Sequence, residues 1–250
     1  MIKRKMPSVL ITRPLATAET MAAALQNLGY ETAIEPLLSI KPTHVRQPKT
    51  GAIDAVMITS GSALATLENR PEEMEELFDI PCFCVGLRTA EKARVFGFRK
   101  VQHAASDGAE LARLVGRAHV ARKNSILHIA GRDVNRETHR EIERLGHNLV
   151  HWPVYEAVPV EAFTAATRQA FKNRTFDALT FYSPRTAQVF VALIKQAALE
   201  TCCAGLAAIC LSPAVADVLK ALNWRFLAAA SQPTEEALIA RLQEICPVSS

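Results

Sequence analysis

The stretch Val9-Leu10-Ile11-Thr12-Arg13-Pro14 decides the fold, because a similar pattern returns in the second half of the chain. Its apolar residues lead into a helical pattern, which ends near Gly29 and is followed by Pro36. The same order recurs 117 positions further on, and three pairs of positions mark it: Val9 with Ile126, Gly29 with Gly146, and Pro36 with Pro153.

A second pair of similar segments extends the repeat. Residues 54–60 (DAVMITS) correspond to residues 177–183 (DALTFYS), at a shift of 123 positions. A repeat of this length is not a solenoid unit, since each copy can bury a core of its own. The chain therefore predicts two similar domains, and two similar domains that face each other form a cleft.

Length and composition are those of a globular protein with two domains of ordinary size: 250 residues, 49% hydrophobic and 22% charged. No apolar run approaches the roughly 18 residues that a membrane helix needs. The basic residues 1–7 precede an apolar segment too short for a signal peptide, so we expect a cytoplasmic protein without a membrane partner. The net charge of +4 is too mild for a nucleic-acid partner, but it permits an anionic small molecule.

The six cysteines lack the paired spacing of zinc ligands. Cys82 and Cys84 are expected to point to opposite faces of one strand, and all six are expected to be reduced core residues. None of the seven histidines falls in a metal-ligand spacing, so no metal site is predicted. His128, within a strand, is expected to be a core residue, and His139 and His147 are expected near a helix surface.

Short apolar runs alternate with amphipathic stretches, which predicts an α/β fold with parallel sheets flanked by helices. The expected strands are 9–12, 55–58, 83–85, 125–129, 178–181 and 207–211. The expected helices are 18–28, 89–96, 110–118, 136–145, 186–194, 214–222 and 235–245. The expected helix caps are Gly29, Gly97 and Gly146 at carboxyl ends, and Asp107 (with Glu110), Ser183, Ser212 and Thr234 at amino ends. Proline-bearing residues 34–42 and 151–159 are read as extended connectors.

Polar residues follow the predicted strands, and ligands of open parallel sheets bind beyond the carboxyl ends of the strands. The helix starts that come next offer unpaired N–H groups to carboxylates, and arginine binds carboxylates bidentately. Any single Ser-Pro pair here is equally well explained as a helix cap alone, and a lone arginine after a strand is more often solvated than bound to a ligand. The chain has neither a Gly-x-Gly-x-x-Gly motif nor a Walker loop, so no nucleotide cofactor is expected.

These motifs, in this order, resemble the uroporphyrinogen-III synthase family over essentially the whole chain. The family's Val-Leu-x-Thr-Arg-Pro opening matches residues 9–14. Its later segments match residues 59–63 (TSGSA), 85–90 (VGLRTA), Val154-Tyr155 and 181–184 (FYSP). Two positions depart from the family pattern: Gly61-Ser62 replaces Pro-Asn, and Val215 replaces a threonine, with Ser212 nearby as a substitute hydroxyl.

The resemblance implies that the domains exchange their first strand–helix units and are joined by a two-stranded connector. One domain is then 1–38 with 156–250, and the other is 39–155, each of flavodoxin-like type. The implied substrate is hydroxymethylbilane, a linear tetrapyrrole with eight carboxylates. It loses its hydroxyl as water and closes through a spiro intermediate, with one pyrrole ring inverted. No cofactor or metal is implied, and we expect a monomer.

Without enzyme the bilane closes to the uninverted isomer, so the enzyme must control conformation. Tyr155 is the candidate catalytic residue, as a proton donor to the departing hydroxyl or as part of the connector's packing. The candidate substrate-binding residues follow the strands: Thr12, Arg13, Ser60, Gly86, Arg88, Thr89, Arg132, Ser183, Arg185 and Ser212. Two alternatives are a non-catalytic two-lobed sensor of an anionic small molecule and an inactive synthase-like domain.

Overall fold

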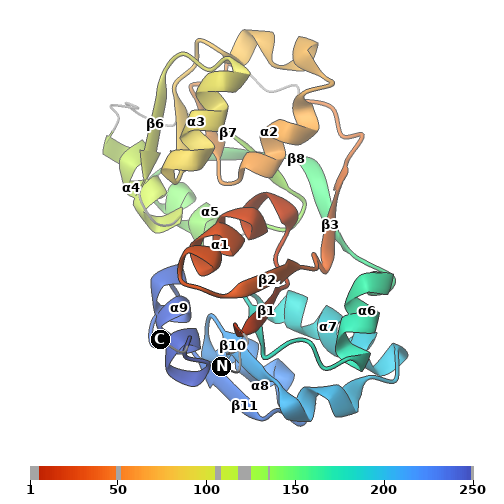
Figure 1. The fold of residues 1–250 in the computed structure, drawn as a ribbon. Helices are drawn as coiled ribbons and strands as arrows, with labels where there is room; N and C mark the ends of the chain where they lie inside the picture. The colour runs from red at the N-terminus through yellow and green to blue at the C-terminus, as the bar shows by residue number, and fades with distance from the viewer. Residues whose placement is uncertain (1–5, 49–51, 105–107, 118–124, 135, 249–250) are drawn as a thin grey trace. The chain divides into compact units, whose positions relative to one another are not determined.

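The computed structural model describes residues 6–48, 52–104, 108–117, 125–134 and 136–248. The chain divides into two compact units (Figure 1). Unit 1 comprises Met1–Ser39 and Val158–Ser250, and unit 2 comprises Ile40–Ala157. The chain passes from one unit to the other within two strands, β3 (Leu38–Pro42) and β8 (Asn148–Pro159), which are neighbours in one sheet. Most residues of the two proline-bearing connectors therefore lie in strands, although Pro36 lies between β2 (Glu31–Ile34) and β3.

Unit 1 contains a five-stranded parallel sheet in the order β11-β10-β9-β1-β2. In Figure 1 the red strands from the start of the chain lie in one sheet with the blue strands from its end. The strands are β1 (Ser8–Ile11), β2 (Glu31–Ile34), β9 (Ala178–Phe181), β10 (Ala207–Cys210) and β11 (Phe226–Ala229). The helices are α1 (Leu15–Asn27), α6 (Ala165–Lys172), α7 (Pro184–Gln196), η3 (Glu200–Gly205), α8 (Pro213–Leu219) and α9 (Glu235–Ile245).

The inner strands of this sheet are buried on both sides, because helices cover both of its faces. On one face, Val9 and Ile11 pack with Met21 of α1 and Leu238 of α9. Aromatic rings fill the other face: Phe181 of β9 contacts Phe190 of α7 at a centroid distance of 5.1 Å, and that cluster is completed by Phe163, Phe171, Phe176 and Trp224.

Unit 2 contains a six-stranded sheet in the order β3-β8-β7-β4-β5-β6, parallel from β8 to β6. Its further strands are β4 (Ala55–Ile58), β5 (Cys82–Val85), β6 (Val101–Ala104) and β7 (Ser125–Gly131). Its helices are α2 (Gly61–Leu67), η1 (Pro71–Glu73), η2 (Glu75–Leu77), α3 (Leu87–Phe96), α4 (Gly108–Arg117) and α5 (Arg136–Arg144). Residues of α2 and α3 pack on one face, and residues of α4 and α5 pack on the other.

The cysteine expectation was wrong in two respects: Cys202 and Cys246 are only half-buried, and Cys82 and Cys84 share a face of their strand. Side chains two residues apart on a strand share a face, and Cys82 and Cys84 indeed lie in the same core, with their Sγ atoms 3.8 Å apart. All six cysteines are free thiols. Burial raises the pKa of Cys203 and of Cys210 to about 12, so both thiols stay protonated and unreactive.

Both units share one plan. If each strand is numbered by its position in the repeat, so that β7 and β8 count as the first two strands of unit 2, then β2-β1-β9-β10-β11 and β8-β7-β4-β5-β6 have the same order. That order is 2-1-3-4-5, which is the flavodoxin-like order. Unit 1 takes its first strand–helix–strand segment from the first repeat and its remaining strands from the second. Unit 2 has the reverse composition, so the predicted exchange of the first units is confirmed.

Two aspartates at equivalent positions fix the exchanged strands. Asp177, just before β9, accepts a hydrogen bond from the backbone N of Ser8 at 2.9 Å, and its own N donates to Ser8 O at 2.8 Å. Asp54, just before β4, holds Ser125 of β7 in the same way, with both distances 2.9 Å. The repeated aspartate therefore sets the register between each exchanged strand and its host sheet.

The six predicted strands are confirmed to within two residues at each end, and all seven predicted helices are present. Positive φ angles of 90°, 129° and 89° at Gly29, Gly97 and Gly146 confirm the helix ends. Ser183 and Thr234 cap helices through their side chains, whereas Ser212 occupies the cap position without a side-chain hydrogen bond. The Asp107 cap lies outside the described residues. The sequence patterns missed β2, β6, β11, α2 and α6.

Candidate active site

Each sheet has a point where neighbouring strands lead to connections that run in opposite directions. This point lies between β1 and β9 in unit 1, and between β7 and β4 in unit 2. Ligands of open α/β sheets bind beyond the carboxyl ends of the strands at such a switch point. Several predicted site residues follow these four strands, so the sequence-based prediction and the topology indicate the same positions.

At the switch point of unit 2 the structure brings Tyr155, Ser60 and Gly131 together. Ser60 caps α2, since its Oγ accepts from Ser62 N at 3.2 Å. Gly131 ends β7, and Tyr155 is its partner in β8. A Cβ atom on Gly131 would lie only 2.7 Å from Cε2 and Cζ of Tyr155, so the ring packs directly on the glycine backbone. Arg132 N donates to Tyr155 O at 2.7 Å and fixes the tyrosine backbone.

Burial raises the pKa of Tyr155, and the nearby charge of Asp133 acts in the same direction. A hydrogen bond with the Ser60 side chain and one with the backbone of Gly131 oppose this shift. The phenol therefore keeps its proton at neutral pH and can donate it. Ser60 and Gly131 are placed to stabilise the phenolate if the proton leaves.

The other predicted residues of unit 2 lie around the same edge of the sheet. Gly86, with a φ of +75°, links β5 to α3, whose first turn contains Arg88 and Thr89. Arg88 is exposed and Thr89 is half-buried. Arg132 follows β7 and lies 3.5 Å from Glu156; the arginine side chain is largely exposed and the glutamate is half-buried.

The predicted residues of unit 1 have more varied surroundings. Thr12 is fully buried and its Oγ1 donates to Thr180 O at 2.7 Å, so its hydroxyl ties β1 to β9. Ser183 Oγ accepts from Thr186 N at 3.1 Å as the cap of α7, and Arg185 lies half-buried in the first turn of that helix. Ser212 begins α8, and the neighbouring Val215 is buried.

Arg13 is partly neutralised within its own unit. It forms an ion pair with Glu235, the first residue of α9, and its guanidinium lies 4.4 Å from the ring centroid of Tyr182. The Tyr182 hydroxyl is buried and has no hydrogen-bond partner among the described residues. Burial is the main cause that raises its pKa. The sequence pattern did not single out Tyr182 or Glu235, although Tyr182 directly follows a predicted strand.

A histidine cluster under the switch point of unit 2 was also missed. His128 on β7 is buried, and its ring neighbours are His139 on α5 and His151 on β8, at centroid distances of 5.0 and 5.7 Å. The spacing of these histidines in the sequence does not predict that they meet. His151 lies beside His128 only because of the parallel register of β7 and β8. Among the described residues, no group of His, Cys, Asp and Glu side chains has the geometry of a metal site.

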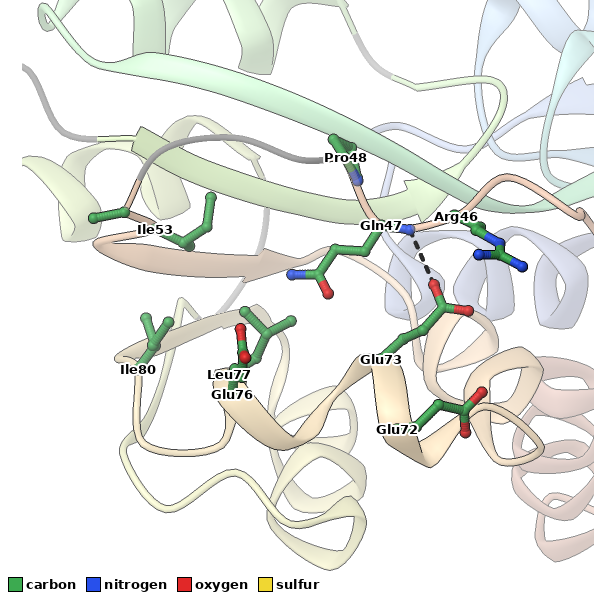
Figure 2. A pocket seen from close by; sticks show the side chains of 10 residues that line it. Arg46, Gln47, Pro48, Ile53, Glu72, Glu73, Glu76, Leu77 and Ile80 are labelled. Carbon is green, nitrogen blue, oxygen red and sulfur yellow. Dashed lines mark hydrogen bonds between the residues drawn. The ribbon is translucent and has the colours of Figure 1, made fainter.

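A cavity of about 690 Å³ lies near the amino ends of β4 and β5, away from the switch point (Figure 2). Figure 2 shows the Glu73 carboxylate bound to the backbone N of Gln47, at 2.9 Å. A hydrogen bond from Arg70 is the main cause that lowers the pKa of Glu73, which is therefore ionised. Glu72 and Glu76 add further negative charge, so this cavity disfavours a polycarboxylate ligand.

The fold and the strand-end residues define a two-unit α/β protein of flavodoxin-like topology, with polar sites at the switch points of its sheets. The chain belongs to the uroporphyrinogen-III synthase HemD family, whose model matches residues 19–240. This membership makes it a lyase, which cyclises hydroxymethylbilane to uroporphyrinogen III with loss of water. No helix in the described part of the chain is long and apolar enough to cross a membrane.

Solved structures agree with the fold. Uroporphyrinogen-III synthetase from Helicobacter pylori 26695 is 19% identical, with a TM-score of 0.59, and the match covers 96% of this chain and 99% of that one. A mutant uroporphyrinogen III synthase from the extremely thermophilic bacterium Thermus thermophilus is 14% identical, with a TM-score of 0.52, over 96% and 98% of the two chains. A search of curated proteins finds no match.

Proposed function

We propose that the switch point of unit 2 supplies the acid for the dehydrative cyclisation, with Tyr155 as the catalytic residue. One observation carries this proposal: a buried phenol, held in its protonated form, lies against a hydroxyl group and a bare glycine backbone at a strand end. An acid in such a place fits the first step of the reaction, in which a hydroxyl must leave as water.

The proton balance is simple. Tyr155 gives its proton to the departing hydroxyl, which leaves as water and creates the electrophilic azafulvene in its protonated, cationic form beside the phenolate. Ser60 and the Gly131 backbone stabilise the phenolate oxygen while it carries charge. When the closed ring system loses a proton to restore the pyrrole, the phenolate takes that proton back. The enzyme returns to its starting state without a cofactor.

The remaining strand-end residues are proposed to bind the substrate's carboxylates and so to hold the bilane in the shape that leads to ring inversion. Support comes from the starts of α3 and α7, where backbone N–H groups follow strand ends. Arg88 and Arg185 lie in the first turns of these helices. Arg13 and Arg132 follow β1 and β7, and each lies near a glutamate.

Further proposals concern the whole chain. We assign the domains as 1–38 with 156–250 and 39–155, which differ by at most two residues from the compact units. A cytoplasmic monomer that binds neither nucleic acid nor membranes is proposed from the mild net charge of +4 and the sequence pattern. A non-catalytic sensor is not favoured, because the chain belongs to a family of synthases.

Replacing Tyr155 with Phe tests the proposed acid. Loss of a general acid costs about 100- to 10,000-fold in rate, so Tyr155→Phe should lower kcat by at least about 100-fold. Product binding should change little. Tyr30→Phe is a matched control, since Tyr30 is also buried and its hydroxyl donates to Cys246 O at 2.8 Å in unit 1. If Tyr155→Phe keeps more than half of the wild-type rate, Tyr155 is not the acid.

A further inference from the structure

The histidine cluster is part of a hydrogen-bond chain that ends at a strand exit. Thr59, directly after β4, has its Oγ1 3.1 Å from His128 Nε2. On the other side of the same ring, His128 Nδ1 lies 2.8 Å from His139 Nε2. Thr59 shares a face of the sheet with Met57, whose partner on β7 is His128. The chain therefore runs from a half-buried hydroxyl, through a buried imidazole, to a half-buried imidazole on α5.

The direction in which these hydrogen bonds donate depends on one proton. Burial, with His139 and His151 as neighbours, lowers the pKa of His128 to about 3, so His128 is neutral and has a single N–H. If His139 is protonated, both of its nitrogens carry hydrogens, and its Nε2–H must donate to His128 Nδ1. The single hydrogen of His128 then sits on Nε2 and donates to Thr59 Oγ1. The hydroxyl hydrogen of Thr59 is left free to donate elsewhere.

A neutral His139 permits the opposite direction. His128 Nδ1–H then donates to His139 Nε2, and His128 Nε2 accepts the hydroxyl hydrogen of Thr59. In this state Thr59 presents only lone pairs to a ligand. Lone pairs repel a carboxylate, whereas a free O–H group binds it.

We propose that His139 and His128 are positioning residues for the substrate: a proton taken up by His139 turns the Thr59 hydroxyl into a hydrogen-bond donor for a substrate carboxylate. This inference rests on the proposed function, because it needs an anionic substrate at the end of β4. Thr59 directly precedes Ser60, the hydrogen-bond partner of Tyr155, and their side chains leave opposite faces of the same strand end. Substrate binding and proton uptake by His139 are then coupled.

The surroundings of His139 lower its pKa, so its neutral state is favoured in the free protein. Burial and then His151 on β8 lower its pKa, whereas Glu143 on its own helix raises it. On β7, His128 is neutral. Arg113 on α4 helps to lower the pKa of Glu141, which lies on the same helix as His139. His151 holds its own proton elsewhere, since its Nε2–H donates to Gly131 O at 2.9 Å and so supports the glycine under Tyr155.

The first test is the pH dependence of KM, followed through the type III isomer, which only the enzyme forms. The wild-type KM should be about tenfold higher at pH 8, where His139 is neutral, than at a pH well below the ordinary histidine pKa of about 6.5, where His139 is protonated. A tenfold change corresponds to one hydrogen bond to a charged group. His139→Gln and Thr59→Val should show a high KM at every pH. Thr59→Ser, which keeps the hydroxyl, should retain the wild-type profile. His103→Gln, at an exposed histidine of the same sheet, is the control.

The second test needs no substrate. In ¹⁵N-histidine-labelled wild-type protein, the nitrogen chemical shifts should show His128 changing from the Nδ1–H to the Nε2–H tautomer as His139 is protonated. A His128 tautomer that does not change, or a His139→Gln profile of KM like that of the wild type, would overturn the proposal. A wild-type protein that forms no type III isomer contradicts the proposed function alone, because the tautomer measurement still decides the coupling.

Discussion

Tyr155 is held against the one residue type that leaves room for its ring. Gly131 ends β7 in a conformation that other residues also adopt, so its role is the close approach of the ring. A methyl group at this position would overlap Cε2 and Cζ of Tyr155, both 2.7 Å from the Cβ position. The position of the phenol therefore depends on the absence of a side chain at Gly131.

Gly131→Ala should displace the Tyr155 ring and lower kcat. Overpacking of this kind costs about 1–3 kcal/mol, so the variant should fold, while turnover falls at least about tenfold because the acid is misplaced. Gly205→Ala is the control, since nothing lies within 4 Å of its Cβ position. Wild-type turnover in Gly131→Ala would show that the ring position is unimportant.

At the scale of residues, the sequence predicts side chains that follow strands better than side chains that meet across them. Ser60 and Tyr155 were predicted from strand-end and connector patterns, and the structure brings them together. Glu235 comes from a helix far along the chain and His139 from the helix that follows β7, and only packing brings them to Arg13 and His128. No spacing along the chain encodes such contacts.

At the scale of elements, α6 is attached to unit 1 by a buried carboxylate. Glu35, just after β2, is 2% exposed and accepts hydrogen bonds from Thr164 N (2.8 Å), Thr164 Oγ1 (2.7 Å) and Thr167 Oγ1 (2.5 Å). These donors include the capping residue of α6. One side chain therefore fixes the start of this helix to the segment that leads into β3.

Glu35→Gln should lower the free energy of unfolding by about 1–3 kcal/mol, because the amide NH₂ replaces an oxygen that accepts hydrogen bonds in a buried site. Urea denaturation at pH 7 measures this change. Glu31→Gln, at an exposed position of β2, should have little effect. Equal stability of the two variants would contradict the role of Glu35.

The missed strands have a common physical cause. β2, β6 and β11 are edge strands, and each exposes more of its residues than the inner strands do. Inner strands such as β4 and β9 are buried on both faces and read as continuous apolar runs. Edge strands lack such runs, so apolar patterning predicts the centre of each sheet and misses its margins.

At the scale of the whole molecule, the repeat predicted two similar domains, but only the family resemblance predicted their exchange. Contiguous and exchanged arrangements contain the same local patterns. The contacts that distinguish them, Asp54 with Ser125 and Asp177 with Ser8, join residues 71 and 169 positions apart. Long-range pairing of this kind is set by the complete fold.

Unit 2 should lose stability in mild acid. The pKa of His128 is about 3 in the folded protein and about 6.5 in an unfolded chain. The unfolded state therefore binds more protons between these pH values, and the free energy of unfolding falls as pH falls. From pH 7.5 to 5 the loss from this group is about 2 kcal/mol.

Denaturation of wild type and His128→Gln at both pH values measures this loss. The variant should lose about 2 kcal/mol less than the wild type on acidification, whereas exposed His103→Gln should match the wild type. An identical acid effect in all three proteins would show that His128 is accessible to protons in the folded state.

The central claim is that this chain directs the closure of the bilane. Purified protein is added to freshly generated hydroxymethylbilane, the products are oxidised to porphyrins, and the isomers are separated. We expect the type III isomer, with its inverted ring, to dominate and to increase with the amount of protein. If the products are the type I isomer alone, as in the reaction without protein, the chain is not a synthase.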